Sequence, residues 1–223
     1  MNRAETGTPP HNCAICPRLA QFRDRHRAEF PDWFNGPVPS FGPAGARLLI
    51  VGLAPGLRGA NRTGRPFTGD YAGDLLYATL AKFGLAQGIY DSRADDGLML
   101  RATRITNAVR CVPPENKPLP AEIAACRPYF QQEMTGLSGL TAILALGQIA
   151  HRQVLAALGL RQSAYPFGHG ALHALPTGLL LADSYHCSRY NTNTGRLTAE
   201  MFEAVFARLM PLLDAATEPA KRG

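Results

Sequence analysis

The stretch LLIVGLAPGLRGANRTGRPFTGD, residues 48–70, decides the fold class. It begins inside RLLIVGL, residues 47–53, which is continuously apolar and therefore typical of a strand buried on both faces of a sheet. A glycine-rich turn and a long polar loop follow. A helix is predicted over 71–84 because leucines and a phenylalanine recur on one face before Gly84. A strand, a turn and a helix in this order indicate an α/β unit.

The rest of the chain repeats this alternation. Further strands are predicted at 104–110, 141–146 and 178–183, and further helices at 119–134, from 147 to 158, and after the capping residue Thr198. Pro128 lies inside the helix predicted at 119–134 and is expected to kink it. The pattern predicts a three-layer α/β/α sandwich around a central, mainly parallel, four-stranded sheet.

The length of 223 residues suits one domain, which we place over 1–223. Residues 1–46 form an N-terminal arm that a proline- and glycine-rich segment joins to the first strand, and 217–223 resemble a loose tail. No apolar run reaches the ~20 residues of a membrane span, and the N-terminus lacks a secretory leader. We therefore expect a soluble cytoplasmic protein. The net charge of +6 favours polyanionic partners, although many soluble proteins are equally basic.

The turn after the first strand is not a familiar nucleotide-binding motif. It lacks the GK[ST] of a P-loop, and G-x-G-x-x-G does not follow the strand directly. Long loops in compact domains are often functional, and ligands of open α/β sheets bind at the carboxyl ends of the strands. Three segments converge there: GLAPG at 52–56, TNAVRCVPP at 106–114 and SYHCSRYN at 184–191. They predict one shared site.

Four cysteines predict a metal site. Cys13 and Cys16 form a C-x-x-C pair, Cys111 follows a predicted strand, and Cys126 lies on a predicted helix. Four thiolates can hold zinc or an iron–sulfur cluster, and these residues leave the choice open. The alternative is a set of unrelated buried cysteines. Cys187 belongs to another segment and is left out.

Taken together, these motifs resemble the uracil-DNA glycosylase superfamily, and most closely its family 5, the type-B enzymes of bacteria and archaea. The matching segments are C-x-x-C at 13–16, GLAPG at 52–56, NRTGRPFTGD at 61–70, TNAVRC at 106–111, Cys126 and HCSRYNTNTGRLT at 186–198. The wholly apolar turn at 52–56 is the type-B pattern. One departure is Cys187, which stands where the family motif has proline; its replacement is expected to loosen the loop.

The resemblance implies a monofunctional DNA glycosylase that removes uracil and other deaminated bases, such as hypoxanthine and xanthine, and so initiates base excision repair. It implies a structural [4Fe-4S] cluster on Cys13, Cys16, Cys111 and Cys126, and no soluble cofactor. The partner would be double- and single-stranded DNA, with no membrane. A monomer in the bacterial or archaeal cytosol is expected.

Such an enzyme flips the damaged nucleotide out of the helix into a pocket. Phe67 is the candidate for stacking on the base, and Asn107 can both donate and accept hydrogen bonds at its edge. By family position, His186 would donate to the departing base and Asp70 would manage the attacking water. Asp74, one helical turn further on, is the alternative to Asp70.

Two further sets complete the predicted site. The pocket floor and wall would comprise Gly52, Ala54, Pro55 and Gly56. The DNA backbone would be held by Arg58, Arg62, Ser188, Arg189, Asn191 and Arg196.

Three other functions compete with this interpretation. Cys187 keeps open a DNA-binding iron–sulfur protein whose base pocket has lost catalysis. Four cysteines also suit a redox protein, and the α/β pattern suits an enzyme of free nucleosides. Each site residue also has an ordinary structural interpretation: an acidic residue such as Asp70, for example, is favoured at a helix N-terminus.

Overall fold

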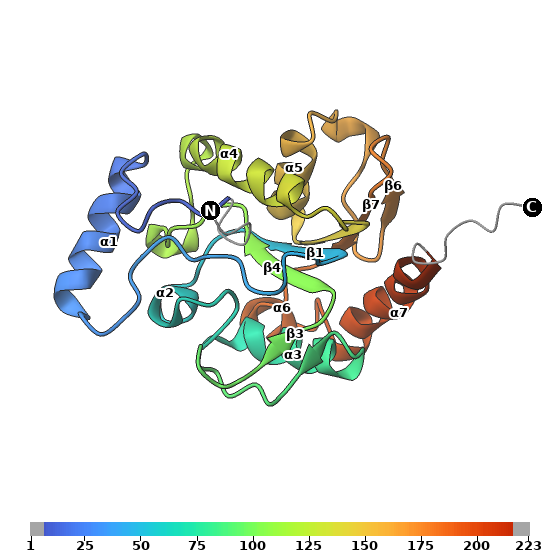
Figure 1. The fold of residues 1–223 in the computed structure, drawn as a ribbon, viewed down its shortest axis with the longest axis horizontal. Helices are drawn as coiled ribbons and strands as arrows, with labels where there is room; N and C mark the ends of the chain where they lie inside the picture. Colours follow the sequence, from blue (N-terminus) through green and yellow to red (C-terminus); the bar gives the residue numbers. More distant parts are fainter. Residues whose placement is uncertain (1–6, 216–223) are drawn as a thin grey trace, which may run out of the picture.

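The computed structural model describes residues 7–215, and side chains as far as 213. Its centre is a five-stranded sheet in the order β4-β1-β5-β7-β6 (Figure 1). The strands are β1 (Leu48–Gly52), β4 (Thr103–Asn107), β5 (Ala142–Leu146), β6 (Leu172–Ala174) and β7 (Leu180–Ser184). The pairings of β4, β1, β5 and β7 are parallel, and β6 alone is antiparallel to its neighbour. The α/β class is confirmed, whereas the four-stranded sheet is wrong by one strand.

The missed strand β6 is only three residues long, and none of its residues is fully buried. It therefore lacks the apolar run that identifies a buried strand. The predicted strand at 104–110 also ends earlier, at Asn107. Beyond it, the N–H groups of Ala108 and Val109 donate to the carbonyls of Gly52 and Leu53 at 3.0 and 2.9 Å. The chain thus follows the loop after β1, which brings the two strand ends together.

The helices are α1 (Pro17–Glu29), α2 (Ala60–Thr63), α3 (Tyr71–Lys82), α4 (Pro120–Gly136), α5 (Gln148–Ala157), α6 (Arg189–Asn193) and α7 (Ala199–Ala215). The four predicted helices are α3, α4, α5 and α7, with small shifts of their ends, whereas α1, α2 and α6 were not predicted. Short 3-10 helices lie at Pro114–Asn116 and Gln162–Ala164, and β2 (Ala86–Gln87) pairs with β3 (Met99–Leu100). Pro128 lies inside α4, which continues through it as one helix.

Alternation along β1 explains the layers. Leu48 and Ile50 belong to the buried cluster that includes residues of α3 and α7, whereas Leu49 and Val51 belong to the cluster that includes residues of α4 and α5. Successive side chains of a strand point to opposite faces, so a continuously apolar strand must be covered on both. Figure 1 shows α4 and α5 above the sheet and α3 and α7 below it.

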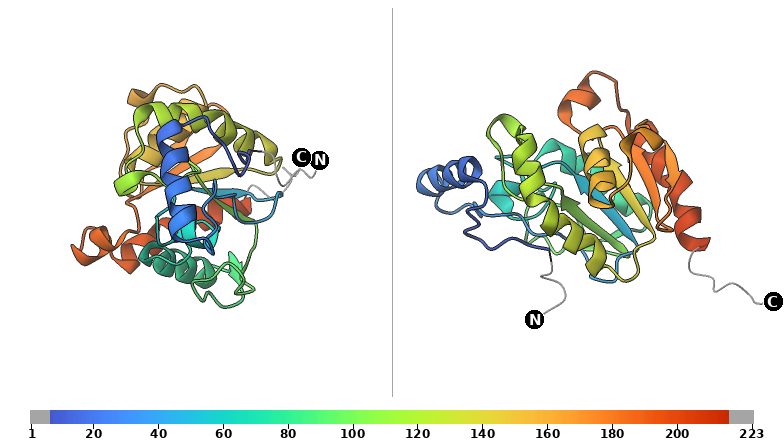
Figure 2. Two further views of the ribbon diagram at one scale, coloured as in Figure 1. Left: turned by 90° about the vertical axis from the view of Figure 1, so that its left-hand side faces the viewer. Right: turned by 90° about the horizontal axis from the view of Figure 1, so that it is seen from above.

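The N-terminal arm packs at one end of the molecule, where α1 lies beside α4 (Figure 2). The guanidinium of Arg18 on α1 donates twice to the carboxylate of Glu122 on α4, at 2.7 and 2.8 Å. The predicted tail at 217–223 and the start of the arm, 1–6, lie outside the described residues. Between 7 and 215, no helix combines the length and apolar character that a membrane crossing requires.

Candidate active site and cysteine cavity

A cavity of about 860 Å³ opens at the carboxyl ends of β1, β4 and β7. Its volume falls within the range of pockets that bind small molecules and cofactors. The predicted site residues that line it are Ala54, Pro55, Gly56, Arg58, Phe67, Asp70, Asn107, His186, Ser188 and Arg189. The convergence of the three distant segments at one edge of the sheet is therefore present in the structure.

The glycine turn makes room for the carboxylate of Asp70. Asp70 caps the N-terminus of α3, where its Oδ1 accepts from the backbone N–H of Gly73 at 3.2 Å. A Cβ atom on Gly59 would lie 2.3 Å from Asp70 Oδ2, and one on Gly56 would lie 3.2 Å from the same oxygen. Burial in this turn raises the pKa of Asp70 by desolvating the charged form. The turn thus holds a protein carboxylate against the cavity.

Asp74, the alternative carboxylate, occupies a different environment. It lies one turn along α3, and its side chain is exposed. It is not among the described residues that line the cavity. Of the two acids, only Asp70 faces the space that a ligand would fill.

Gly52 lies against Asn107 and Phe67, which line the cavity, although Gly52 itself is not among the described lining residues. It is paired with Asn107 across β1 and β4. A Cβ atom on Gly52 would lie 2.4 Å from Asn107 Oδ1 and 2.7 Å from Phe67 Cζ, so only glycine permits this approach. Asn107 is buried, and within the described chain its Oδ1 has no hydrogen-bond partner. That oxygen is an available acceptor at the cavity wall.

Phe67 is held in a strained backbone conformation. Its φ of +52° lies in the left-handed region, which a bulky residue adopts only where its surroundings enforce it. The hydroxyl of Tyr90 donates to the Phe67 carbonyl at 3.3 Å. Gly73 packs so closely on the same carbonyl that a Cβ there would lie 1.9 Å from it. These contacts fix the aromatic ring over the cavity floor.

His186 completes the opposite wall. It follows β7, and its ring stacks on Phe67 with centroids 5.8 Å apart and an interplanar angle of 29°. Burial lowers the pKa of His186 to about 4. The imidazole is therefore neutral at pH 7 and carries one N–H donor. The side-chain amide of Asn191 donates to the His186 carbonyl at 2.8 Å and so holds this segment in place.

Cys187 is fully buried in the cluster that also contains Leu76 and Phe202. Burial first, and then the charge of Asp70, raises the pKa of its thiol. The Cys187 side chain therefore packs in the core close to Asp70.

Of the six residues predicted to hold DNA, three line the cavity and three do not. Arg58, Ser188 and Arg189 line the cavity, and the Arg189 guanidinium lies 5.4 Å from the centroid of the Tyr71 ring. The other three contact the protein itself. The Asn191 side chain donates to the His186 carbonyl. The Nε of Arg62 donates to the Arg58 carbonyl at 2.9 Å. The Arg196 guanidinium lies 4.7 Å from the centroid of the Tyr185 ring.

Sequence reasoning missed Tyr71 and Asn116 among the lining residues. Tyr71 is partly exposed and directly follows Asp70, so an aromatic residue beside a candidate acid was the available signal. Asn116 ends the 3-10 helix between β4 and α4 and has a φ of +57°. Its loop follows the strand that carries Asn107, which was the only sequence indication.

The four predicted cysteine ligands line one cavity, together with apolar residues that include Leu19 and Val109. Cys16 caps α1, Cys111 follows β4 and Cys126 lies on α4. The cavity therefore lies between the arm and the domain core. Cys187 is not among the described residues that line it.

Burial and mutual proximity raise the pKa of three thiols in this cavity, those of Cys16, Cys111 and Cys126. For Cys111 the pKa rises to about 12, through desolvation first and the neighbouring Cys126 second. Cys16 and Cys126 shift in the same direction for the same causes. Thiols that lie in one cavity and disfavour each other's ionisation suit a bound soft cation, which stabilises thiolates. The donor set therefore fits a metal or cluster.

Comparison with known proteins shows which family the chain belongs to. The model of the Uracil DNA glycosylase superfamily matches residues 39–210, most of the chain. The chain belongs to this superfamily. It is 50% identical to a type-5 uracil-DNA glycosylase of Thermus thermophilus over 85% of this chain and 89% of that protein. It is 40% identical to a type-5 uracil-DNA glycosylase of Pyrobaculum aerophilum over 88% of this chain and 87% of that protein.

More distant superfamily members also match. A type-4 uracil-DNA glycosylase of Pyrobaculum aerophilum is 33% identical over 67% of this chain and 63% of that protein. The match to the type-5 proteins is both longer and higher in identity. This agrees with the resemblance to the type-B enzymes that the motifs of the sequence indicate.

Proposed function

We propose that the protein is a monofunctional DNA glycosylase that hydrolyses the N-glycosidic bond of uracil, and of deaminated purines such as hypoxanthine and xanthine. The observation that carries this proposal is the single cavity that Phe67, Asn107, His186 and Asp70 share. Its similarity to type-5 uracil-DNA glycosylases over most of their length supports the same activity. Release of the base would initiate base excision repair.

The cavity wall supplies recognition of a flipped base. The ring of the base would stack on Phe67. The polar edge of the base would form hydrogen bonds with the free Oδ1 and the amide N–H of Asn107. A buried Asn107 amide without hydrogen-bond partners would raise the free energy of the complex. A base that forms these hydrogen bonds is therefore bound in preference to one that does not. This contact would discriminate uracil from bases with a different edge pattern.

His186 would stabilise the leaving base. Breaking the glycosidic bond leaves negative charge on the base, and a fixed N–H donor beside it lowers the barrier. The depressed pKa keeps the imidazole neutral at physiological pH. Stacking on Phe67 orients the ring before substrate binds, so little reorganisation is needed during the reaction.

Asp70 would position and deprotonate the water that attacks the sugar. Its raised pKa brings the carboxylate closer to the operating pH, where a general base is most effective. No lysine lines the described cavity, so a Schiff-base intermediate is not proposed. Hydrolysis then ends at an abasic site, and no soluble cofactor is required.

DNA would approach through Arg58, Ser188 and Arg189 at the cavity rim. We infer that both double- and single-stranded DNA are substrates, because the contacts are to the backbone and the base is read only after flipping. The protein would act as a monomer, since one chain supplies every lining residue. We infer that the activity takes place in the cytosol, at the nucleoid, and the bacterial and archaeal sources of the relatives support this inference.

The salt dependence of binding tests this interface. Arg189→Ala is expected to weaken binding to duplex DNA and to reduce the slope of log K against log salt concentration by about one. The measurement is fluorescence anisotropy across a series of salt concentrations. Arg152→Ala removes an exposed arginine on α5, away from the cavity, and should leave the slope unchanged. Equal slopes for all three proteins would contradict the assignment.

Gly52→Ala tests the cavity floor. The added Cβ collides with Asn107 Oδ1 and the Phe67 ring, so turnover is expected to fall by about 10²-fold, the loss that small misplacements cause. Gly45→Ala is the matched control, because a Cβ there meets nothing within 4 Å. Uracil release under single-turnover conditions measures both. A Gly52→Ala protein as active as the Gly45→Ala protein would refute this description of the floor.

We further propose that Cys13, Cys16, Cys111 and Cys126 hold a structural [4Fe-4S] cluster. When bound, the cluster would cross-link the arm to β4 and α4. Within the protein, the Arg110 N–H donates to the Cys126 sulfur, and the Arg23 guanidinium donates to the Cys13 carbonyl at 2.9 Å. The Arg110 contact favours the Cys126 thiolate, and the Arg23 contact fixes the backbone at Cys13.

Cys126→Ser is expected to remove the iron and sulfide and to lower the melting temperature. Iron and acid-labile sulfide analysis, with the visible absorption spectrum, measures the loss. Cys187→Ala should retain the cluster, because Cys187 lies outside the cysteine cavity. Stoichiometric zinc and no iron in anaerobically purified protein would contradict the iron assignment.

Chromatography of the released base tests the proposed function. The wild-type protein should release free uracil from a uracil·guanine duplex and leave free deoxyuridine intact. Hypoxanthine and xanthine duplexes establish the range of bases. Binding of the uracil duplex without release would indicate a DNA-binding protein with an inactive pocket, whereas cleavage of deoxyuridine would indicate a nucleoside enzyme.

A further inference from the structure

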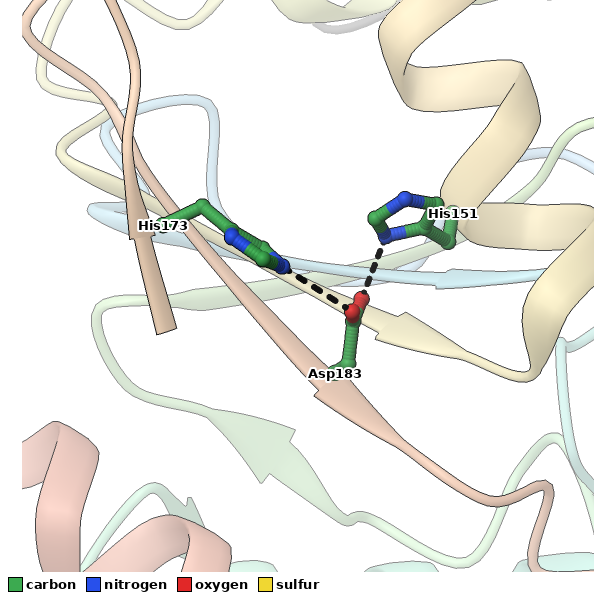
Figure 3. Close-up of side chains that lie close together, drawn as sticks. All are labelled: His151, His173 and Asp183. Carbon is green, nitrogen blue, oxygen red and sulfur yellow. Dashed lines mark hydrogen bonds and ion pairs between the residues drawn. The ribbon is translucent and has the colours of Figure 1, made fainter. Parts of the chain in front are cut away.

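His151, His173 and Asp183 converge outside the active-site cavity (Figure 3). They come from α5, β6 and β7, three neighbouring elements at the other end of the sheet from β4. One ligand atom of each residue lies within 4.8 Å of those of the other two. Two imidazoles and one carboxylate are a ligand set that divalent transition metals favour.

His151 is oriented as a metal-ligating histidine would be. Its Nε2 lies 2.8 Å from the Tyr165 carbonyl, an acceptor that requires the N–H on this nitrogen. Its Nδ1 lies 2.7 Å from Asp183 Oδ1. At that distance Nδ1 donates a proton to the carboxylate, and a bound cation would displace this proton and take its place between the two atoms. Metal-ligating histidines commonly donate their second N–H to a backbone carbonyl in this way.

The second histidine leaves two buried atoms unsatisfied. His173 Nε2 lies 3.5 Å from Asp183 Oδ2, and neither atom has a hydrogen-bond partner in the described structure. Asp183 is fully buried, whereas the His173 side chain is 14% exposed. An unpaired carboxylate oxygen in a dry site is costly. A cation between these atoms would satisfy both, and the exposed edge of His173 offers an entry path.

We propose that His151, His173 and Asp183 form a binding site for one divalent transition-metal cation such as Zn²⁺, separate from the cysteine cavity. The cation would replace the direct contact between His151 and Asp183 and join α5, β6 and β7. Asp183 lies three residues before His186, so the site would stabilise the strand that leads to the active-site loop. Its role is structural and does not depend on the proposed glycosylase activity.

Zinc binding by the whole protein, with its cysteine site loaded, tests this proposal. The wild type should retain one more zinc per chain after dialysis than His173→Gln, and zinc should raise its melting temperature. In His173→Gln the zinc-dependent shift should disappear, with affinity at least about tenfold weaker. Glutamine keeps a donor toward Asp183, so loss of hydrogen bonding alone does not explain this result.

Two further variants sharpen the experiment. His26→Ala removes a histidine on α1, outside the cluster, and should bind zinc as the wild type does. Asp183→Asn keeps the shape of the buried side chain and should lose the same zinc. Equal zinc content and equal shifts in wild type and His173→Gln would overturn the proposal. So would a wild type whose melting temperature does not respond to zinc.

Discussion

Asp70→Asn is expected to lower the rate of uracil release by about 10²- to 10⁴-fold, the range for losing a general base. Asparagine keeps the size of the side chain and still caps a helix N-terminus, so α3 should remain folded. What it loses is the ability to take a proton from the attacking water. Single-turnover release of uracil from excess-enzyme reactions measures the chemical step directly.

Asp74→Asn is the control for this variant. Asp74 is exposed and lies outside the cavity lining, so its neutralisation should leave the rate nearly unchanged. Loss of activity in Asp74→Asn with full activity in Asp70→Asn would reverse the assignment of the base.

The pH profile provides a second check on Asp70. A base must be ionised, so activity should fall as pH decreases through the pKa of Asp70. Because burial raises this pKa, the acid limb of kcat/KM should lie above the ordinary aspartate value of 3.8. The pH profile of the residual kcat/KM of Asp70→Asn should lack this acid limb.

His186→Ala is expected to lower kcat by about 10²- to 10³-fold, as loss of an oxyanion-type donor does. The KM should change less, because the donor acts mainly on charge that develops in the transition state. Steady-state kinetics with a uracil-containing duplex separates the two constants. His186→Gln, which retains an N–H donor, should recover part of the loss.

His11→Ala removes an exposed histidine of the arm and serves as the control. NMR titration adds a readout that is independent of activity. The His186 ring should titrate near pH 4, since burial holds its pKa at about that value. A ring that titrates near 6.5 would show an imidazole exposed to solvent and contradict its place in the cavity wall.

The main features of the fold were predictable because burial on both faces leaves a strong pattern. The apolar run at 47–53 is typical of a strand covered on both faces, and β1 is that strand. The three residues of β6 and the two-residue strands β2 and β3 carry no comparable pattern. Their positions depend on pairing with distant segments, which local periodicity does not encode.

The same distinction applies to the site. Asn107 and His186 were predictable because parallel strands end at one edge of the sheet, wherever the intervening helices go. The packing of Gly59 on Asp70 could not be predicted, because tertiary contacts determine the path of the loop from 53 to 70. Asn191 was expected to contact DNA, yet it bonds the His186 carbonyl and holds the loop. A polar residue in a loop has the same sequence signal in either role.

An end-labelled duplex with one uracil opposite guanine tests the central claim most directly. The labelled strand is incubated with wild-type protein and analysed with and without hot alkali. The account predicts a break at the uracil position only after alkali, because hydrolysis leaves an intact strand with an abasic site. An intact strand after alkali would contradict the proposed activity, and a break without alkali would contradict the hydrolytic mechanism assigned to Asp70 and His186.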